Sequence, residues 1–170
     1  MTPDELRALQ APIKARYRDD PASARETFRA QGTLVPGGTT CTLATMLGPL
    51  DAGLHPKAGG DGREACSGDL LLQALVACAG VTFNVVATAM AIPFRSVTVV
   101  AEGEGDFRGT LGVAREVPVG MTAIRLRFEV DSPASDEQLA LLLKQAERWC
   151  VILQTLQHPP PVSASVVRVG

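Results

Sequence analysis

Two cysteines lie at positions where leucine or alanine would pack equally well, and their thiols are the groups in this sequence with the clearest chemical use. Cys78 interrupts the apolar stretch of residues 65–83, and Cys150 ends a second stretch with apolar residues at helical spacing. A cysteine in an apolar helix usually serves as a small, inert side chain. Two thiols on helices that pack together would instead form a redox pair. The spacing alone leaves both interpretations open.

Cys41 and Cys66 complete the set of four cysteines. We expect Cys41 to lie on a strand, with its side chain in the protein core. Cys66 directly precedes a helix, where the helix dipole lowers a thiol pKa, although a small residue at a tight turn is the simpler explanation. No C-x-x-C pattern occurs, and His55 and His158 each lie beside a proline in an expected loop, so we expect neither a zinc site nor a disulfide framework.

The composition is that of an ordinary protein of one domain, residues 1–170. With 46% hydrophobic and 20% charged residues and a net charge of −2, the chain has no global attraction to nucleic acid. The N-terminus lacks the pattern of a signal peptide. The apolar stretch 70–94 contains Gln73, Asn84 and Thr88 and is flanked by charges, which favours a buried helix over a membrane span. We therefore expect a cytoplasmic protein with four free thiols.

The first half of the chain predicts two helices, a set of short strands and one long helix. Thr2 and Glu5 form a capping box for the first helix, and a second is expected from Asp20 to about Ala30, so that residues 1–31 form a helical extension. β-type residues broken by glycine and proline then predict a meander over residues 33–56. The glycine-rich loop 57–64 leads into the long helix, expected over residues 67–93.

The second half predicts antiparallel strands and one more helix. Residues 96–101 alternate as a strand and are expected to pair with residues 106–114 in a hairpin. Residues 123–131 alternate most clearly, with Ile124 and Phe128 on a buried face and Arg125 on a wet face. A capping box at Ser135 begins the next helix, and residues 162–169 are expected to form a final strand. The fold class is therefore α+β, with antiparallel sheets packed around a long central helix.

Three segments give the sequence a family resemblance. CSGDLLLQALVACAGVTF, DFRG and LLKQAERWCVILQTL resemble the OsmC/Ohr family of thiol peroxidases, and the resemblance extends from Cys66 to the C-terminus. Residues 1–31 do not resemble the opening strand that is usual in the family. The resemblance implies a single OsmC-like domain in an intertwined homodimer, with active sites at the subunit boundary.

The resemblance also implies a reaction and its residues. Cys78 would attack the distal oxygen of an organic hydroperoxide and become a sulfenic acid, which Cys150 would resolve as a disulfide. An external dithiol would reduce the disulfide, and no metal or organic cofactor is needed. A free thiol with a pKa of about 8.5 is only slightly ionised at neutral pH, so a nearby cation is expected to activate Cys78. The apolar surroundings favour alkyl and lipid hydroperoxides.

The sequence departs from the family at the residues around the thiol. Family members usually have a Pro-Glu-Glu-Leu-like stretch at the head of the central helix, but residues 67–70 read Ser-Gly-Asp-Leu. Asp69 is our candidate for the carboxylate that orients an arginine, and Arg63 is the candidate arginine. Arg16, Arg18 or an arginine of a second subunit are alternatives. The usual proline after the second cysteine is Val151 here.

These departures leave two other functions open. A non-catalytic protein that binds a small molecule could use the same fold without the activating residues. A structural interaction module would leave all four cysteines unreactive. Thiol titration and peroxide consumption separate both alternatives from the peroxidase.

Overall fold

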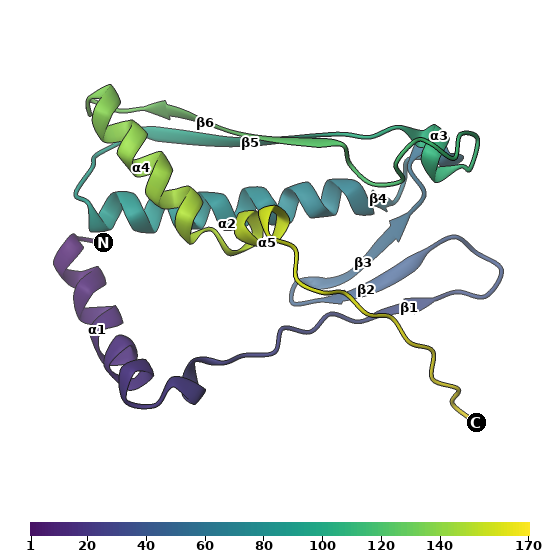
Figure 1. Cartoon of the computed structure of the whole chain (residues 1–170), viewed down its shortest axis with the longest axis horizontal. Coiled ribbons are helices and arrows are strands. Elements are labelled where there is room, and N and C mark those ends of the chain that lie inside the picture. Colours follow the sequence, from purple (N-terminus) through teal and green to yellow (C-terminus); the bar gives the residue numbers. More distant parts are fainter.

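A computed structural model describes all 170 residues as helices and short strands in an open arrangement (Figure 1). The helices of more than one turn are α1 (Pro3–Asp19), α2 (Ser67–Ala89), α4 (Asp136–Trp149) and α5 (Val151–Gln157), with α3 (Phe107–Thr110) a single turn. The strands are β1 (Gly32–Leu34), β2 (Cys41–Thr45), β3 (Gly48–Gly53), β4 (Ala65–Cys66), β5 (Ser96–Glu104) and β6 (Ala123–Asp131). The fold is α+β, as the sequence predicts.

The predicted meander is confirmed as a small sheet in the order β1-β2-β3-β4. Its first three strands are antiparallel, with Cys41 of β2 opposite Ala52 of β3, and the two residues of β4 run parallel to β3. Gly48 begins β3 with φ of 115°, a left-handed conformation that side chains other than glycine rarely adopt. The sheet delivers the chain directly to the start of α2.

The second sheet consists of β5 and β6, paired antiparallel along their whole length. Ile124 and Phe128 are half-buried while Arg125 is exposed, which confirms the predicted faces of this strand. The predicted hairpin between β5 and residues 106–114 is wrong. Asp106 instead caps α3, accepting a hydrogen bond of 2.9 Å from the backbone N–H of Arg108, so this segment turns as a helix and β5 pairs with β6.

Helix α2 is the centre of the fold and packs against β5, α4 and α5. Two groups of buried residues lie along it: Phe83, Ala87, Ile92, Leu142 and Ala146 near its C-terminal end, and Leu75, Ala79 and Cys150 near its middle. The helix is long and apolar enough to cross a membrane by length and composition, but these contacts are those of a core helix. It ends four residues earlier than predicted because Ala91 adopts a positive φ of 53°.

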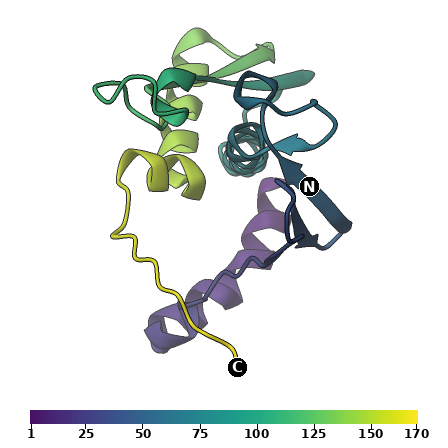
Figure 2. The same ribbon diagram turned by 90° about the vertical axis from the view of Figure 1, so that its right-hand side faces the viewer.

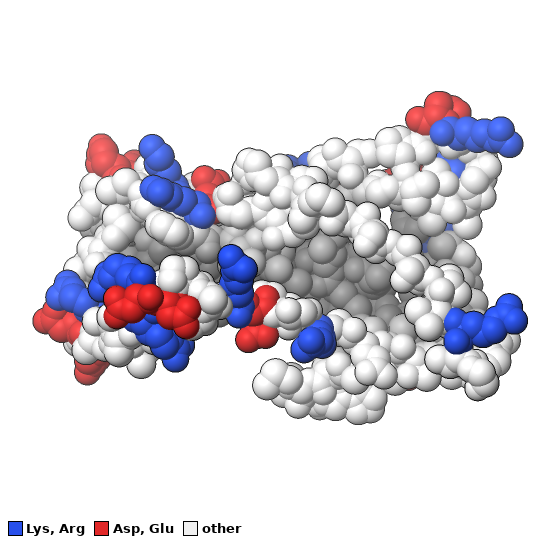
Figure 3. All heavy atoms as spheres, turned by 60° about the horizontal axis from the view of Figure 1, so that its bottom comes forward, with Lys and Arg blue, Asp and Glu red and all other residues white.

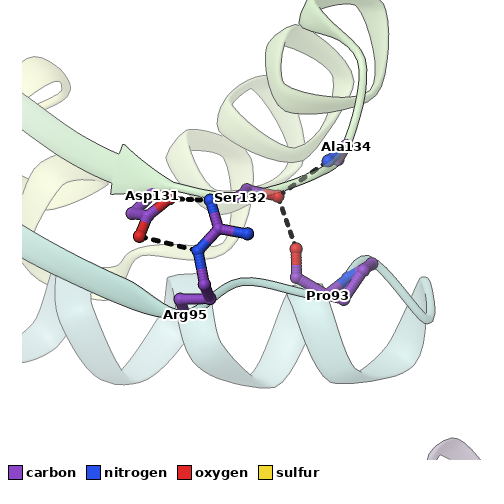
Figure 4. Close-up of polar contacts among 5 residues, drawn as sticks. All are labelled: Pro93, Arg95, Asp131, Ser132 and Ala134. Atoms are coloured by element: carbon purple, nitrogen blue, oxygen red, sulfur yellow. Dashed lines mark hydrogen bonds and ion pairs between the residues drawn. The ribbon is translucent and has the colours of Figure 1, made fainter.

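Polar contacts at one end of the β5–β6 pair, where Ser96 lies opposite Asp131, join the strands to the turns of the flanking helices (Figure 4). The Arg95 guanidinium holds the Asp131 carboxylate at both of its oxygens, with Nε donating at 2.8 Å to Oδ2. The Ser132 hydroxyl donates to the carbonyl oxygen of Pro93 and accepts from the backbone N–H of Ala134 at 3.0 Å. The turn after α2 is thereby joined to the turn before α4, which fixes where α4 begins.

The chain termini differ from the predictions. The capping box of Thr2 and Glu5 is present at the start of α1, but the second predicted helix is only a 3₁₀ turn at Pro21–Ala24, followed by extended chain. No residue of that turn is buried, so nothing beyond its cap stabilises a longer helix. The predicted strand 162–169 is also wrong for the single chain: these residues are exposed and pair with no other strand.

The single chain leaves an unusually large area of surface exposed. Its accessible surface is 12908 Å², whereas a compact monomer of 17.9 kDa exposes about 8,000 Å². Only 9 of 170 residues are buried. Helix α1 lies away from α4 and α5 (Figure 2), and a hollowed face of the molecule carries charged residues mainly around its margins (Figure 3).

Candidate functional site

The structure brings Cys78 and Cys150 together at the middle of the fold. Cys78 lies on α2, one helical turn after the buried residue Leu75. Cys150 is both the C-cap residue of α4 and the N-cap residue of α5. Its backbone N–H donates to the carbonyl oxygen of Ala146 at 3.0 Å. Because α4 and α5 both pack on α2, the break between these two helices holds the Cys150 thiol within hydrogen-bonding reach of Cys78.

The surroundings of Cys78 favour its thiolate. Burial acts to raise the pKa of Cys78, but hydrogen bonds to the sulfur outweigh it and hold the pKa below its ordinary value. The backbone N–H groups of Ile152 and Val151 supply two of these hydrogen bonds. The side chains of Cys150 and Thr82 supply the others. The sulfur of Cys78 is therefore the better nucleophile of the pair.

The pKa of Cys150 shifts in the opposite direction. Burial is the largest cause and raises it, and the hydrogen bond to Cys78 together with the negative charge of that thiolate raise it further. The backbone N–H groups of Leu153 and Ile152 act against this but do not reverse it. Cys150 therefore stays protonated where Cys78 is ionised, and its S–H donates to the Cys78 sulfur.

The structure does not bring Arg63 or Asp69 to this pair within the chain. Arg63 lies in the loop before α2, where its side chain is 88% exposed and pairs with Asp61 at 3.5 Å. Asp69 lies in the first turn of α2, nine residues before Cys78, which is about 13 Å along the helix axis. No arginine is among the groups that shift the pKa of Cys78.

The other two cysteines lie apart from the pair. Cys66 is the N-cap residue of α2 and lines a cavity of about 510 Å³ together with Asp69 and His55. Cys41 is half-buried on β2, in the small sheet. The sequence placed Cys41 in the core, and the structure gives it a partly exposed position at the meander instead.

Sequence analysis missed three of the groups that contact Cys78. Thr82 is one helical turn beyond Cys78, and a polar residue at position i+4 in an apolar helix was the available signal. The backbone N–H groups of Val151 and Ile152 left no signal, because they depend on the helix break at Cys150, and the chain has no proline there to mark it.

A model of one protein family matches most of the chain. The family model described as OsmC-like protein matches residues 60–165, which include α2, both cysteines of the pair and all of α5. No curated protein matches the sequence.

Solved structures share the fold at low sequence identity. An OsmC like protein from Mycoplasma pneumoniae is 21% identical, with a TM-score of 0.65, and the match covers 79% of this chain and 89% of that chain. An organic hydroperoxide resistance protein OsmC from Legionella pneumophila is 19% identical, with a TM-score of 0.62 and coverages of 79% and 92%. One from Elizabethkingia anophelis is 15% identical, with a TM-score of 0.59 and the same coverages.

Proposed function

The chain belongs to the family of OsmC-like proteins, and from this we propose that it is a thiol-dependent peroxidase that reduces organic hydroperoxides. Two of the structurally similar proteins are called organic hydroperoxide resistance proteins. The observation that carries the proposal is the contact between Cys78 and Cys150, whose pKa values are displaced in opposite directions. A nucleophilic thiolate beside a protonated thiol is the arrangement that a two-cysteine peroxidase needs.

The proposed reaction has two steps on the protein. The Cys78 thiolate attacks the distal oxygen of the hydroperoxide, an S–O bond forms as the O–O bond breaks, and the alkoxide leaves as the alcohol after it takes a proton. Cys150 then attacks the sulfur of the Cys78 sulfenic acid, an S–S bond forms, and water leaves. An external dithiol returns the disulfide to two thiols by exchange and is itself oxidised.

The hydrogen bonds to the Cys78 sulfur prepare it for the first step. The N–H groups of Val151 and Ile152 and the hydroxyl of Thr82 hold negative charge on the sulfur before attack. The Cys150 thiol is already in contact with the sulfur that it must join, so resolution needs little movement of α4 or α5. Both steps can therefore proceed at one place in the fold.

We propose that Arg63 and Asp69 act on the Cys78 thiol of a second subunit rather than on that of their own chain. Cys78 lies 11 residues into α2, about 16 Å along the axis from its first residue, so the loop that carries Arg63 ends well short of the thiolate of its own chain. We propose that the protein is an intertwined homodimer in which Arg63, oriented by Asp69, approaches Cys78 of the partner subunit. The exposed surface of the single chain, about 5,000 Å² above that of a compact monomer, supports the dimer.

The second candidate is a non-catalytic small-molecule-binding protein on the same fold. The observation in its favour is that no arginine reaches Cys78 within the chain. We also propose a cytoplasmic location, which is supported by the four free cysteines, because thiols stay reduced there.

The test is peroxide consumption by the reduced protein with an alkyl hydroperoxide and a dithiol. We expect turnover by the natural protein, none by Cys78→Ser, and unchanged turnover by Cys41→Ser as the matched control. Absence of turnover by the natural protein, with its thiols shown to be reduced, would support the binding protein instead.

A further inference from the structure

The corner between α4 and α5 interrupts the backbone hydrogen bonds of a helix at Cys150. The last regular bond of α4 runs from the Cys150 N–H to the carbonyl oxygen of Ala146 at 3.0 Å. The next one runs from the Gln154 N–H to the carbonyl oxygen of Cys150 at 2.9 Å. The N–H groups of the residues between them, 151–153, donate to no backbone carbonyl. Because backbone N–H groups away from water need acceptors, these groups must bond elsewhere.

Two of these N–H groups, those of Val151 and Ile152, donate to the Cys78 sulfur. In an uninterrupted helix, the Val151 N–H would instead donate to the carbonyl oxygen of Glu147, four residues earlier. The N–H of Val151 therefore has two acceptors that compete for it. One is the carbonyl that would continue α4, and the other is the sulfur that it contacts in this structure.

The side chain of Gln154 takes the place of the Val151 N–H at the end of α4. Its Nε2 donates to the carbonyl oxygen of Glu147 at 3.0 Å and to Oε1 of Gln157 at 3.2 Å. Gln154 is half-buried, and its own N–H bonds to Cys150, so its backbone and its side chain both tie α5 to the end of α4. The carbonyl of Glu147 therefore keeps a donor although the helical N–H has turned away.

We propose that Gln154 is a positioning residue of the thiol pair, because its amide holds the carbonyl oxygen of Glu147 and so leaves the Val151 N–H directed at the Cys78 sulfur. Without the amide, the carbonyl of Glu147 loses its donor, and the Val151 N–H is the group that supplies one in a continuous helix. The corner then closes toward that helix, and the sulfur loses a donor. Gln154 acts only through Val151, and its part in peroxide reduction rests on the proposed peroxidase function.

The test is the rate of Cys78 alkylation by iodoacetamide as a function of pH, followed by peptide mapping of the reduced protein. Gln154→Met keeps the length of the side chain but removes the donor. The Cys78 thiol should then be less ionised and react about three- to tenfold more slowly at neutral pH. The two rates should converge at high pH, where the thiol is ionised in both proteins. Gln157→Met makes the same change three residues on, where the side chain only accepts, and should leave the profile unchanged.

A second variant tests the route through Val151. Proline is well tolerated at the first residue of a helix, and Cys150 has φ of −76° and ψ of 107°, an extended conformation that suits a following proline. Val151→Pro has no N–H to turn toward either acceptor, so it should itself move the alkylation profile to higher pH. Adding Gln154→Met to Val151→Pro should cause no further change, because the two variants remove the same contact.

Two results would overturn the proposal. The first is a profile of Gln154→Met that coincides with that of the natural protein or of Gln157→Met, even where the variant is less stable in urea, since the amide would then have a structural role only. The second is an equal loss of rate from Gln154→Met with and without Val151→Pro, which would separate the amide from the Val151 N–H. Alkylation needs no peroxide. A shifted profile in a protein that consumes no hydroperoxide would therefore contradict the peroxidase and leave the role of Gln154 standing.

Discussion

The Cys150 thiol hydrogen-bonds to the sulfur of Cys78, and this contact lowers the pKa of Cys78 while it raises that of Cys150. In the proposed reaction, Cys78 is the nucleophile and Cys150 is the protonated thiol beside it. The same break between α4 and α5 supplies the backbone donors to Cys78 and the second thiol, so both contacts have one structural cause.

Alkylation of Cys78 should report its lowered pKa. A lower pKa means more thiolate at a given pH, so the rate of reaction with iodoacetamide should reach half its maximum at a lower pH than for an ordinary free cysteine. Thr82→Val removes one donor to the sulfur and should move the profile to higher pH. Thr88→Val, on the same helix, should leave it unchanged. Identical profiles for the natural protein and Thr82→Val would show that Thr82 does not stabilise the thiolate.

Arg63→Ala should slow peroxide reduction by about ten- to a hundredfold without loss of the fold, because the residue is in an exposed loop. Arg115→Ala, another exposed loop arginine, is the control and should have normal activity.

Mixed dimers test the proposed contact across subunits. Arg63→Ala and Cys78→Ser chains refolded together should regain activity at the site that combines an intact Cys78 with an intact Arg63 of the partner subunit. Activity no greater than that of the separate variants would mean that another arginine, or none, activates the thiol.

Leu142→Ala should lower the free energy of unfolding by about 2–5 kcal/mol, because Leu142 is 0% exposed and its truncation leaves a cavity between α4 and α2. Leu143→Ala, one residue on and 38% exposed, should cost much less. Urea unfolding at one fixed protein concentration measures both. Equal losses would contradict the packing of α4 on α2 described above.

The protein should sediment at twice the 17.9 kDa mass of the chain at micromolar concentration. A single chain exposes Val81, Trp149 and Val151 at more than half of their surface near the thiol pair, and burial of such groups stabilises a dimer. A stable monomer in sedimentation equilibrium would remove the proposed route by which Arg63 reaches the thiolate.

Local patterns in the sequence predicted the elements whose stability is local. The capping boxes at Thr2 and Ser135 are present, and the alternation along β6 placed Ile124 and Arg125 on the correct faces. The hairpin at residues 106–114 was wrong because a side-chain cap at Asp106 competes with strand pairing, which periodicity does not represent. The strand predicted at 162–169 has β-type residues but finds no sheet edge in its own chain.

The candidate site was predictable only in part. The family resemblance named Cys78 and Cys150, and the structure brings these two together. The hydrogen bonds that shift their pKa values come from backbone groups at a helix break, and backbone N–H groups are the same at every residue but proline. Arg63 and Asp69 do not reach the Cys78 thiol within the chain, and in the proposed dimer their positions depend on contacts between subunits, which local sequence patterns do not represent.

The most direct test of the central claim is a peptide map after one equivalent of an alkyl hydroperoxide has been added to the reduced protein. We expect a disulfide between Cys78 and Cys150 as the main product, with Cys41 and Cys66 still reduced and little sulfinic acid. In Cys150→Ser, the sulfenic acid of Cys78 should accumulate and react with dimedone. A reduced Cys78 after treatment, or a disulfide that joins Cys66 to either member of the pair, would contradict the assignment of Cys78 as the attacking thiol and Cys150 as the resolving one.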